Sequence, residues 1–342
     1  MPVEYRNMGR SGLKVSVPIL GMMSMGDSKW EPWVLDSEDA LPILKRAYDL
    51  GVTTWDTANA YSNGKSEVLI KEAMETYNIP RDELVIMTKV YYAVPKENMG
   101  DSFLVDLRQD PKYVNQFGLS RGAIFKQVDA CLQRLGTDYI DLLQIHRYDK
   151  AIDPEEVMEA LHDIVKSGKV RYIGASSMWL YEFARLQHVA ELRGWTTFIS
   201  MQNIYNLIYR EEEREMIPFC KLKGIGIMPW SPLHQGILAR PLAADVSSNR
   251  KETGTGVFTQ QALQLSSAET VRRLEEISLK RGWSMAQTAL IWLTGKVVSP
   301  VVGINSIKRL EEAVEINGLA LSVEENNYLE EPYAPQPVFG HF

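Results

Sequence analysis

Residues 53–61, with the sequence TTWDTANAY, join a short strand-forming segment to an acidic residue and then to a tyrosine. Gly51 and Val52 lead into the segment, and its Thr and Trp residues favour a β-strand. Asp56 closes this strand, and burying a carboxylate without a partner is costly. The stretch therefore predicts a buried cation beside Asp56, with the phenol of Tyr61 close by.

Two further apolar segments supply candidate partners, because one ends on Lys89 and the other on His146. The carboxyl ends of neighbouring parallel strands meet at one edge of a sheet, so Asp56, Lys89 and His146 are expected to lie close together. Tyr61 follows directly after the first of these ends. We therefore predict a catalytic set for proton transfer that consists of Tyr61, Lys89, Asp56 and His146.

Each member of the set has an expected role. Tyrosine has an ordinary pKa of about 10, which is high for a general acid near neutral pH. Lys89 is expected to lower the pKa of Tyr61, and Asp56 is expected to keep Lys89 charged. His146 is expected to orient the substrate oxygen. Taken singly, the residues also fit a structural ion pair and a core histidine, but four such residues on neighbouring strand ends favour catalysis.

Helices and strands alternate along the chain. Ser37 can cap an amphipathic helix, Gly51 fits the end of that helix, and a strand follows at once. The same order of helix, glycine and strand returns at four later positions: Gly136, Gly168, Gly194 and Gly224. This alternation is typical of a parallel sheet covered by helices.

Eight candidate strands favour a closed α/β barrel, the (β/α)8 TIM barrel, over a doubly wound sheet. They lie at residues 17–21, 53–56, 84–89, 139–145, 171–175, 197–202, 225–229 and 298–302. One domain is expected to span residues 1–342, because barrels of this kind often run this long. Additions to the barrel are an N-terminal β-hairpin at 5–20, a long insertion at 90–118 after the strand that ends at Lys89, a polar loop at 240–262, and an irregular tail at 332–342 over the barrel mouth.

Composition excludes several classes of protein. The net charge of −7 and the lack of a basic run argue against nucleic acid or an anionic membrane surface as a partner. No apolar stretch reaches the roughly 20 residues that span a bilayer, and no signal core is present, so a cytoplasmic protein is expected. Cys131 and Cys220 predict no disulfide framework. The histidines lack ligand spacing, so no metal site is predicted, and the lack of a GxGxxG motif disfavours a Rossmann domain.

Seven segments carry a family resemblance, and they occur in family order between about residue 5 and residue 318. They are WDTANAY at 55–61, MTK at 87–89, IDLLQIHR at 140–147, GASS at 174–177, QN at 202–203, WSPL at 230–233, and residues 303–312. With them the chain resembles the aldo-keto reductases. The insertion and the tail are similar to those of fungal members.

The resemblance implies NADPH as the cofactor, extended across the barrel mouth, with Trp230 stacked on the nicotinamide. It also implies that Ser176, Gln202 and Asn203 hold the carboxamide. The other implied cofactor-binding residues are Gly21, Met22, Met23 and Asp56 near the catalytic set, Ser231, Leu233, Gln235, Gly236 and Leu238 along the pyrophosphate and ribose, and Gly303, Asn305, Arg309 and Glu312 around the adenosine, with Arg240 or Arg309 near the 2′-phosphate. Several of these residues also fit structural roles, as helix cap, turn, core or solvated surface.

The function expected from this resemblance is NADPH-dependent reduction of an aldehyde or ketone, with a small carbonyl compound as the partner molecule. The alternative is an NADPH-binding regulatory subunit that resembles the potassium-channel β subunits. The catalytic set does not separate the two, because such subunits can retain it. Consumption of NADPH with aromatic aldehydes would separate them.

The insertion at 90–118 opens on the strand end that carries Lys89. The next helix is expected to start at Ser120, which leaves the insertion as surplus chain. Together with Trp30 and Tyr91 it is expected to form an aromatic pocket for a bulky carbonyl substrate, which adds Trp30, Tyr61, Tyr91 and His146 as substrate-binding residues. The alternative is a surface segment packed on a neighbouring helix.

Overall fold

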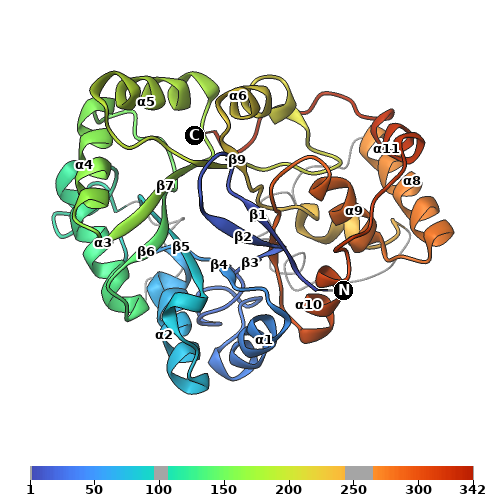
Figure 1. Cartoon of the computed structure of the whole chain (residues 1–342), viewed down its shortest axis with the longest axis horizontal. Coiled ribbons are helices and arrows are strands. Elements are labelled where there is room, and N and C mark those ends of the chain that lie inside the picture. The colour runs from blue at the N-terminus through green and yellow to red at the C-terminus, as the bar shows by residue number, and fades with distance from the viewer. Residues whose placement is uncertain (1, 96–106, 243–264, 342) are drawn as a thin grey trace.

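Eight parallel strands lie at the centre of the described chain, which comprises residues 2–95, 107–242 and 265–341 of a computed structural model (Figure 1). In sheet order they are β10 (Val301–Gly303), β3 (Ile19–Gly21), β4 (Thr54–Asp56), β5 (Val85–Val90), β6 (Ile140–Ile145), β7 (Val170–Ser176), β8 (Ser200–Gln202) and β9 (Gly226–Ile227). All seven strand pairings in this order are parallel.

Backbone hydrogen bonds also join the two ends of this order. Val298, just before β10, donates from its N–H to the Ile227 carbonyl at 3.0 Å. Val301 donates in the same way to the Pro229 carbonyl at 2.9 Å. The predicted (β/α)8 barrel is therefore confirmed.

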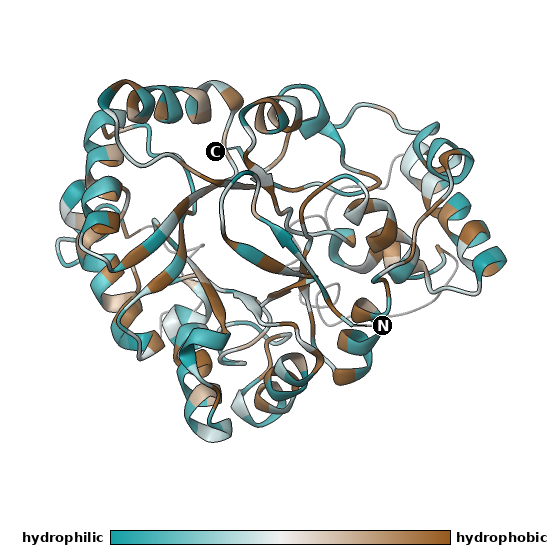
Figure 2. Cartoon of the chain, in the orientation of Figure 1, coloured by the Kyte–Doolittle hydropathy of each residue, from teal (hydrophilic) through white to brown (hydrophobic). Residues whose placement is uncertain are grey.

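Helices surround the barrel, and Figure 2 shows hydrophobic residues along the strands and both hydrophobic and hydrophilic residues on the ring of helices. In chain order they are α1 (Ser37–Leu50), α2 (Lys65–Tyr77), α3 (Arg121–Leu135), α4 (Pro154–Lys166), α5 (Leu180–Arg193), α6 (Met216–Lys223), α8 (Leu265–Arg281), α9 (Met285–Thr294), α10 (Ile307–Val314) and α11 (Val323–Glu330). The main core lies between strands and helices, because outward residues such as Trp55 and Leu143 pack with the buried faces of the helices.

Of the two helix caps predicted from sequence, the one at Ser120 is confirmed and the one at Ser37 is wrong. Ser120 caps α3, and its hydroxyl accepts a hydrogen bond from the Ala123 N–H. The expected cap Ser37 is instead the first residue of α1, and Asp36 holds the cap position. The Asp36 carboxylate accepts hydrogen bonds from Ser28 rather than from the helix.

An N-terminal hairpin of β1 (Glu4–Asn7) and β2 (Lys14–Val17) precedes the barrel, as predicted. Its buried residues form a second core with inward residues of the barrel, which are Ile19, Met87, Leu142, Met228 and Val301. The turn of the hairpin meets the chain just before β9, where Arg10 donates to the Gly224 carbonyl at 2.8 Å. A side chain at Gly9 would lie 2.2 Å from that carbonyl oxygen, so the close approach requires glycine. The hairpin thus covers the end of the barrel at which β9 begins.

The insertion after β5 is described only in part, because residues 96–106 lie outside the described chain. Beyond that gap, Leu107, Tyr113 and Phe117 pack on Ala93 in a small apolar cluster. Gly118 then donates to the Tyr91 carbonyl at 2.7 Å, which returns the chain to the end of β5. The described part of the insertion is therefore a packed segment beside that strand end.

Gly174 on β7 gives a test of packing inside the barrel. A methyl group at this position would lie 2.2 Å from the Ser200 hydroxyl and 3.3 Å from Cγ of Gln144. Overpacking of this kind costs about 1–3 kcal/mol, so Gly174→Ala is expected to lower the melting temperature. Gly122→Ala is the matched control, because its methyl group would meet nothing within 4 Å on α3, where alanine is favoured. A melting temperature that Gly174→Ala leaves at the control value would contradict this view of the interior.

Candidate active site

The alternation of side chains along the strands brings four polar residues into the barrel. Lys89 on β5 and Gln144 on β6 are paired in register, and both point inward, since residues one step along each strand pack outward. Asp56 ends β4, and Gln202 ends β8. These four side chains are buried and in mutual contact, so they form one polar layer inside the barrel.

Lys89 lies at the centre of the catalytic set. Its ammonium is 2.5 Å from Oδ2 of Asp56, and the two side chains are 1% and 2% exposed. It also donates to the Thr57 carbonyl at 2.9 Å and to the Tyr61 hydroxyl at 3.4 Å. The structure thus brings together the acid, cation and phenol that the sequence predicted.

The second oxygen of Asp56 is held by two amides. Gln144 donates to Oδ1 at 2.8 Å and Gln202 donates to it at 3.0 Å. Gln202 also donates to the side-chain oxygen of Gln144 at 3.0 Å. Gln202 is a predicted cofactor-binding residue, whereas Gln144 has no predicted role. The signal for Gln144 was a polar residue in an apolar strand, two positions before His146.

Backbone hydrogen bonds fix the loop that carries Tyr61. Thr57 donates to the Met87 carbonyl at 2.8 Å, and Asn59 donates to the Lys89 carbonyl at 3.0 Å. The loop therefore continues the pairing of β4 with β5 for three residues beyond Asp56. This extension places Tyr61 directly above the end of β5.

The surroundings of Tyr61 and Lys89 favour the protonated form of both side chains. Burial raises the pKa of Tyr61 by more than Lys89, as expected, lowers it, so the net direction is upward. Burial alone would lower the pKa of Lys89, but Asp56 and Tyr61 raise it by more. Near neutral pH, Tyr61 therefore keeps its proton and Lys89 keeps its charge.

His146 follows β6 and is 5% exposed. Its ring meets that of Tyr61 edge-on, with centroids 5.8 Å apart. Burial, and then the charges of Arg147 and Lys89, hold the pKa of His146 well below its usual value. The imidazole is therefore neutral at pH 7 and offers a hydrogen bond without a charge.

Aromatic side chains surround Tyr61 and His146. Trp30 belongs to a buried cluster with Tyr61 and contacts Trp33 edge-on at 6.0 Å. On the other side Tyr92, which the sequence analysis did not single out, contacts His146 at 5.3 Å. The predicted Tyr91 instead packs against Tyr92 and Phe117, both at 5.1 Å. Only the ring contacts in the folded chain distinguish Tyr92 from Tyr91, so residue identity alone could not decide between the two tyrosines.

A second polar group lies at the ends of β7, β8 and β9. Ser177 donates its backbone N–H to the side-chain oxygen of Asn203 at 2.9 Å. Its hydroxyl accepts a hydrogen bond from the indole of Trp230 at 3.0 Å and lies 3.3 Å from the Ser176 hydroxyl. Ser176 in turn donates to the Gln202 carbonyl at 2.7 Å. The structure therefore joins Ser176, Gln202, Asn203 and Trp230 through Ser177.

The chain after Trp230 turns sharply over the barrel mouth. Backbone φ angles are positive at Ser231, His234, Gln235 and Gly236, and within the turn His234 donates its N–H to the Ser231 carbonyl and Gly236 donates to the Leu233 carbonyl. A side chain at Gly236 would lie 3.2 Å from the Arg240 guanidinium. The turn thus lies beside a cation, and a guanidinium is a favourable partner for a phosphate.

The remaining predicted cofactor residues lie in four places. Met22 is buried beside Asp56, whose carbonyl accepts its N–H at 2.9 Å, and Gly21 and Met23 flank it. At the start of α10, Arg309 is exposed and donates to Asn305 at 2.7 Å. The positions of the other members are Leu233 and Leu238 within the turn, exposed Gly303 at the end of β10, and half-buried Glu312 on α10.

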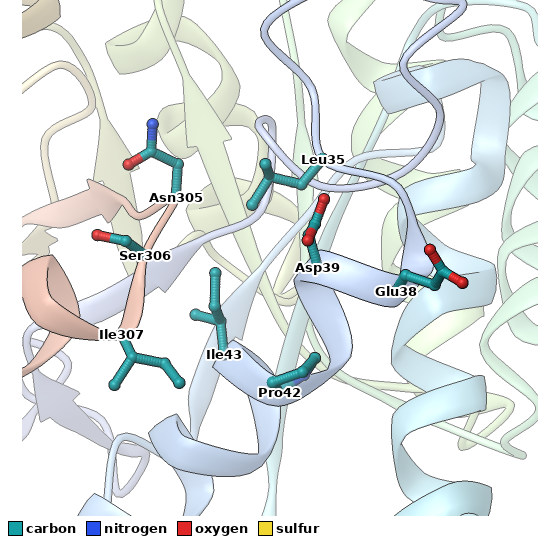
Figure 3. A pocket seen from close by; sticks show the side chains of 8 residues that line it. All are labelled: Leu35, Glu38, Asp39, Pro42, Ile43, Asn305, Ser306 and Ile307. Carbon is teal, nitrogen blue, oxygen red and sulfur yellow. The ribbon is translucent and has the colours of Figure 1, made fainter.

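A separate pocket of about 500 Å³ opens between α1 and the start of α10 (Figure 3). Its walls are Leu35, Glu38, Asp39, Pro42, Ile43, Asn305, Ser306 and Ile307. None of the catalytic set lines it. Its two carboxylates disfavour a phosphate, although Asn305 belongs to the residues predicted around the adenosine.

Within residues 2–95, 107–242 and 265–341, no group of three His, Cys, Asp or Glu side chains is arranged to hold a metal ion. In the same ranges, no helix has the length and apolar character needed to cross a membrane.

Comparison with known proteins identifies the family. The model of the aldo/keto reductase family matches residues 19–334, which include all eight strands and the catalytic set. The chain belongs to the aldo/keto reductase family. It is therefore an oxidoreductase of a family that typically uses NAD(P)H.

Fungal aldo-keto reductases resemble the chain along nearly its whole length. An aldo-keto reductase of Fusarium vanettenii is 50% identical over 345 residues, which cover 99% of this chain and 93% of the relative. Versiconal hemiacetal acetate reductase of Aspergillus parasiticus is 48% identical over 340 residues, 98% of each chain. A putative aryl-alcohol dehydrogenase of Schizosaccharomyces pombe is 48% identical over 348 residues, which cover 99% of this chain and 98% of the relative.

The ion pair of the aldo-keto reductase site gives a stability test. Lys89→Met would leave the Asp56 carboxylate buried without its cation, and Asp56→Asn would leave the Lys89 ammonium without its anion. Each change is expected to cost about 3–5 kcal/mol, whereas the double variant removes both charges and should lose less than either single variant. Denaturant unfolding of the four proteins measures this double-mutant cycle. Additive losses would show that the charges do not depend on one another.

Proposed function

We propose that this aldo-keto reductase reduces an aldehyde or ketone to an alcohol with NADPH, and that Tyr61 is the general acid. The main support is the contact of Lys89 with two groups at once, at 2.5 Å from the Asp56 carboxylate and 3.4 Å from the Tyr61 hydroxyl. A charged ammonium beside a protonated phenol suits a general acid, because it stabilises the phenolate that proton transfer leaves behind.

The proton and the hydride have separate sources in this proposal. NADPH, when bound, supplies the hydride for the carbonyl carbon. Tyr61 gives its hydroxyl proton to the carbonyl oxygen, and Lys89 stabilises the remaining phenolate. Neutral His146 can donate a hydrogen bond to the same oxygen and so orient the carbonyl toward Tyr61.

The cofactor would lie across the strand ends from the catalytic set toward α10. Ser176, Gln202 and Asn203 would hold the carboxamide, with the face of Trp230 against the nicotinamide ring. The turn at 231–238 would take the pyrophosphate. The outer residues proposed to bind the adenosine half are Arg240, Gly303, Asn305, Arg309 and Glu312.

The aromatic surroundings support a bulky or aromatic carbonyl substrate. Trp30 and Tyr92 lie against Tyr61 and His146, and Tyr91 packs behind Tyr92. Relatives named for a hemiacetal acetate and for aryl alcohols agree with this class of substrate. Both described cysteines are free and buried, in keeping with a reducing compartment, and the proposal includes a cytoplasmic location and a single domain.

Tyr61→Phe tests the general acid. The variant keeps the ring that packs with Trp30 but lacks the proton, so reduction of an aromatic aldehyde is expected to fall by about 10²–10⁴-fold. NADPH binding, measured by quenching of tryptophan fluorescence, is expected to stay close to that of the wild type.

Tyr92→Phe is the matched control, because it removes a neighbouring hydroxyl but keeps the ring against His146. It should retain most of the activity. Turnover by Tyr61→Phe at the rate of this control would refute the assignment of Tyr61.

Arg240→Ala and Arg309→Ala test the choice of cofactor. Charge-assisted contacts favour the 2′-phosphate of NADPH, so at least one variant is expected to weaken NADPH binding by about tenfold while it leaves NADH binding nearly unchanged. Titration of both cofactors against the wild type and the variants measures this. Equal affinity of the wild type for NADH and NADPH would overturn the proposed preference.

A further inference from the structure

The C-terminal segment returns to the barrel mouth and packs on Trp230. In Figure 1 the C-terminus lies between α5 and α6. The ring of Phe339 meets Trp230 with centroids 6.5 Å apart, and the two belong to one apolar cluster with Tyr209. The Phe339 N–H donates to the Tyr209 hydroxyl at 2.9 Å, which fixes the segment at this point.

Glu212, in the turn before α6, connects the same segment to Asn203. One carboxylate oxygen accepts a hydrogen bond from the Asn203 amide at 2.7 Å. The other lies 2.9 Å from Nε2 of His341. Glu212 is 3% exposed, and the His341 ring is held edge-on against Trp179 at 4.8 Å. A buried carboxylate thus joins the end of the chain to β8.

The contacts continue from Asn203 to the indole. The side-chain oxygen of Asn203 accepts a hydrogen bond from the Ser177 N–H at 2.9 Å, and the Ser177 hydroxyl accepts one from the Trp230 indole N–H at 3.0 Å. A series of hydrogen bonds therefore runs from Glu212 through Asn203 and Ser177 to Trp230, and the His341 ring lies against its outer end. Phe339, in the same C-terminal segment as His341, packs on the same indole ring.

We propose that Glu212 is a positioning residue that fixes Asn203, Ser177 and Trp230, and that His341 and Phe339 hold this set in place. The proposal rests on the proposed function in one respect, namely that these residues face the nicotinamide. The C-terminal segment would then determine how tightly the nicotinamide half of the cofactor is held, although Glu212 itself touches neither cofactor nor substrate.

Glu211 provides a matched control in the adjacent position. It is also buried and also holds the C-terminal segment, since its carboxylate accepts the Tyr333 hydroxyl at 2.5 Å and the Gln336 N–H at 2.8 Å. Its other partner is Arg214. The two glutamates therefore share an anchoring role, but the contact with Asn203 belongs to Glu212.

The experiment compares Glu212→Ala, Glu212→Gln, His341→Ala and Glu211→Ala with the wild type. One readout is the indole ¹⁵N–¹H NMR resonance of Trp230 in the protein without cofactor, assigned with Trp230→Phe. The second is NADPH affinity by fluorescence titration, and the third is KM for a small aldehyde. Glu212→Ala is expected to shift the resonance and weaken NADPH binding by about tenfold, as expected for loss of a hydrogen bond to a charged group.

His341→Ala should act in the same direction, and Glu212→Gln should recover most of the loss, because its amide oxygen can still accept from Asn203. Glu211→Ala, which keeps the contact of Glu212 with Asn203, should change the resonance and the NADPH affinity less than Glu212→Ala does, and KM for the aldehyde should stay similar throughout. An unshifted resonance in both Glu212→Ala and His341→Ala would overturn the inference, as would an equal shift in Glu211→Ala. If Glu212→Ala does not fold, His341→Ala and Glu212→Gln decide the matter.

The NMR readout separates this inference from the proposed function. If the wild type does not bind NADPH, the proposed function fails, but the Trp230 resonance still decides whether Glu212 positions the indole. If the wild type binds and reduces normally while the resonance is unaffected by Glu212→Ala and His341→Ala, the positioning role fails alone.

Discussion

The buried contact between Asp56 and Lys89 constrains the rest of the site. Neither charge is stable inside the barrel alone, because desolvation of an isolated ion exceeds what the surrounding protein returns. The pair therefore needs a defined register of β4 with β5, in which Asp56 lies opposite Met87, two residues before Lys89. The ion pair also holds the Lys89 ammonium against the Tyr61 hydroxyl. One side chain, Lys89, therefore both balances the charge of Asp56 and positions the phenol.

The fold could be predicted because its signals are local and repeated. Helices α1, α3, α5 and α6 each end at a glycine, and a short strand follows, so strand ends could be located and their polar residues compared. Asp56, Lys89 and His146 came from this comparison. The sequence could not show that Asp36 rather than Ser37 holds the cap position of α1, because both residue types are common at helix caps. In the structure Asp36 holds this position, and its carboxylate contacts Ser28.

What the sequence missed depends on contacts between distant segments. Tyr91 and Tyr92 are the same residue type at adjacent positions, and only the path of the chain after β5 directs Tyr92 to His146. The pKa of Tyr61 depends on how completely the site is buried, which residue identity does not give. Glu212 lies in a run of three glutamates that suggests a solvated surface, yet the returning C-terminal segment buries it.

The double donation by Gln202 has a consequence for any molecule that reaches this face of the barrel. A primary amide carries two hydrogens, and those of Gln202 point to Asp56 and Gln144. The side chain therefore has only its carbonyl oxygen left to offer. A ligand group that meets Gln202 must bring a hydrogen of its own, so an amine or amide N–H fits at this point and a carboxylate or carbonyl oxygen does not. The hydrogen bonds of Gln202 inside the barrel thus determine that a ligand at this point must be a hydrogen-bond donor.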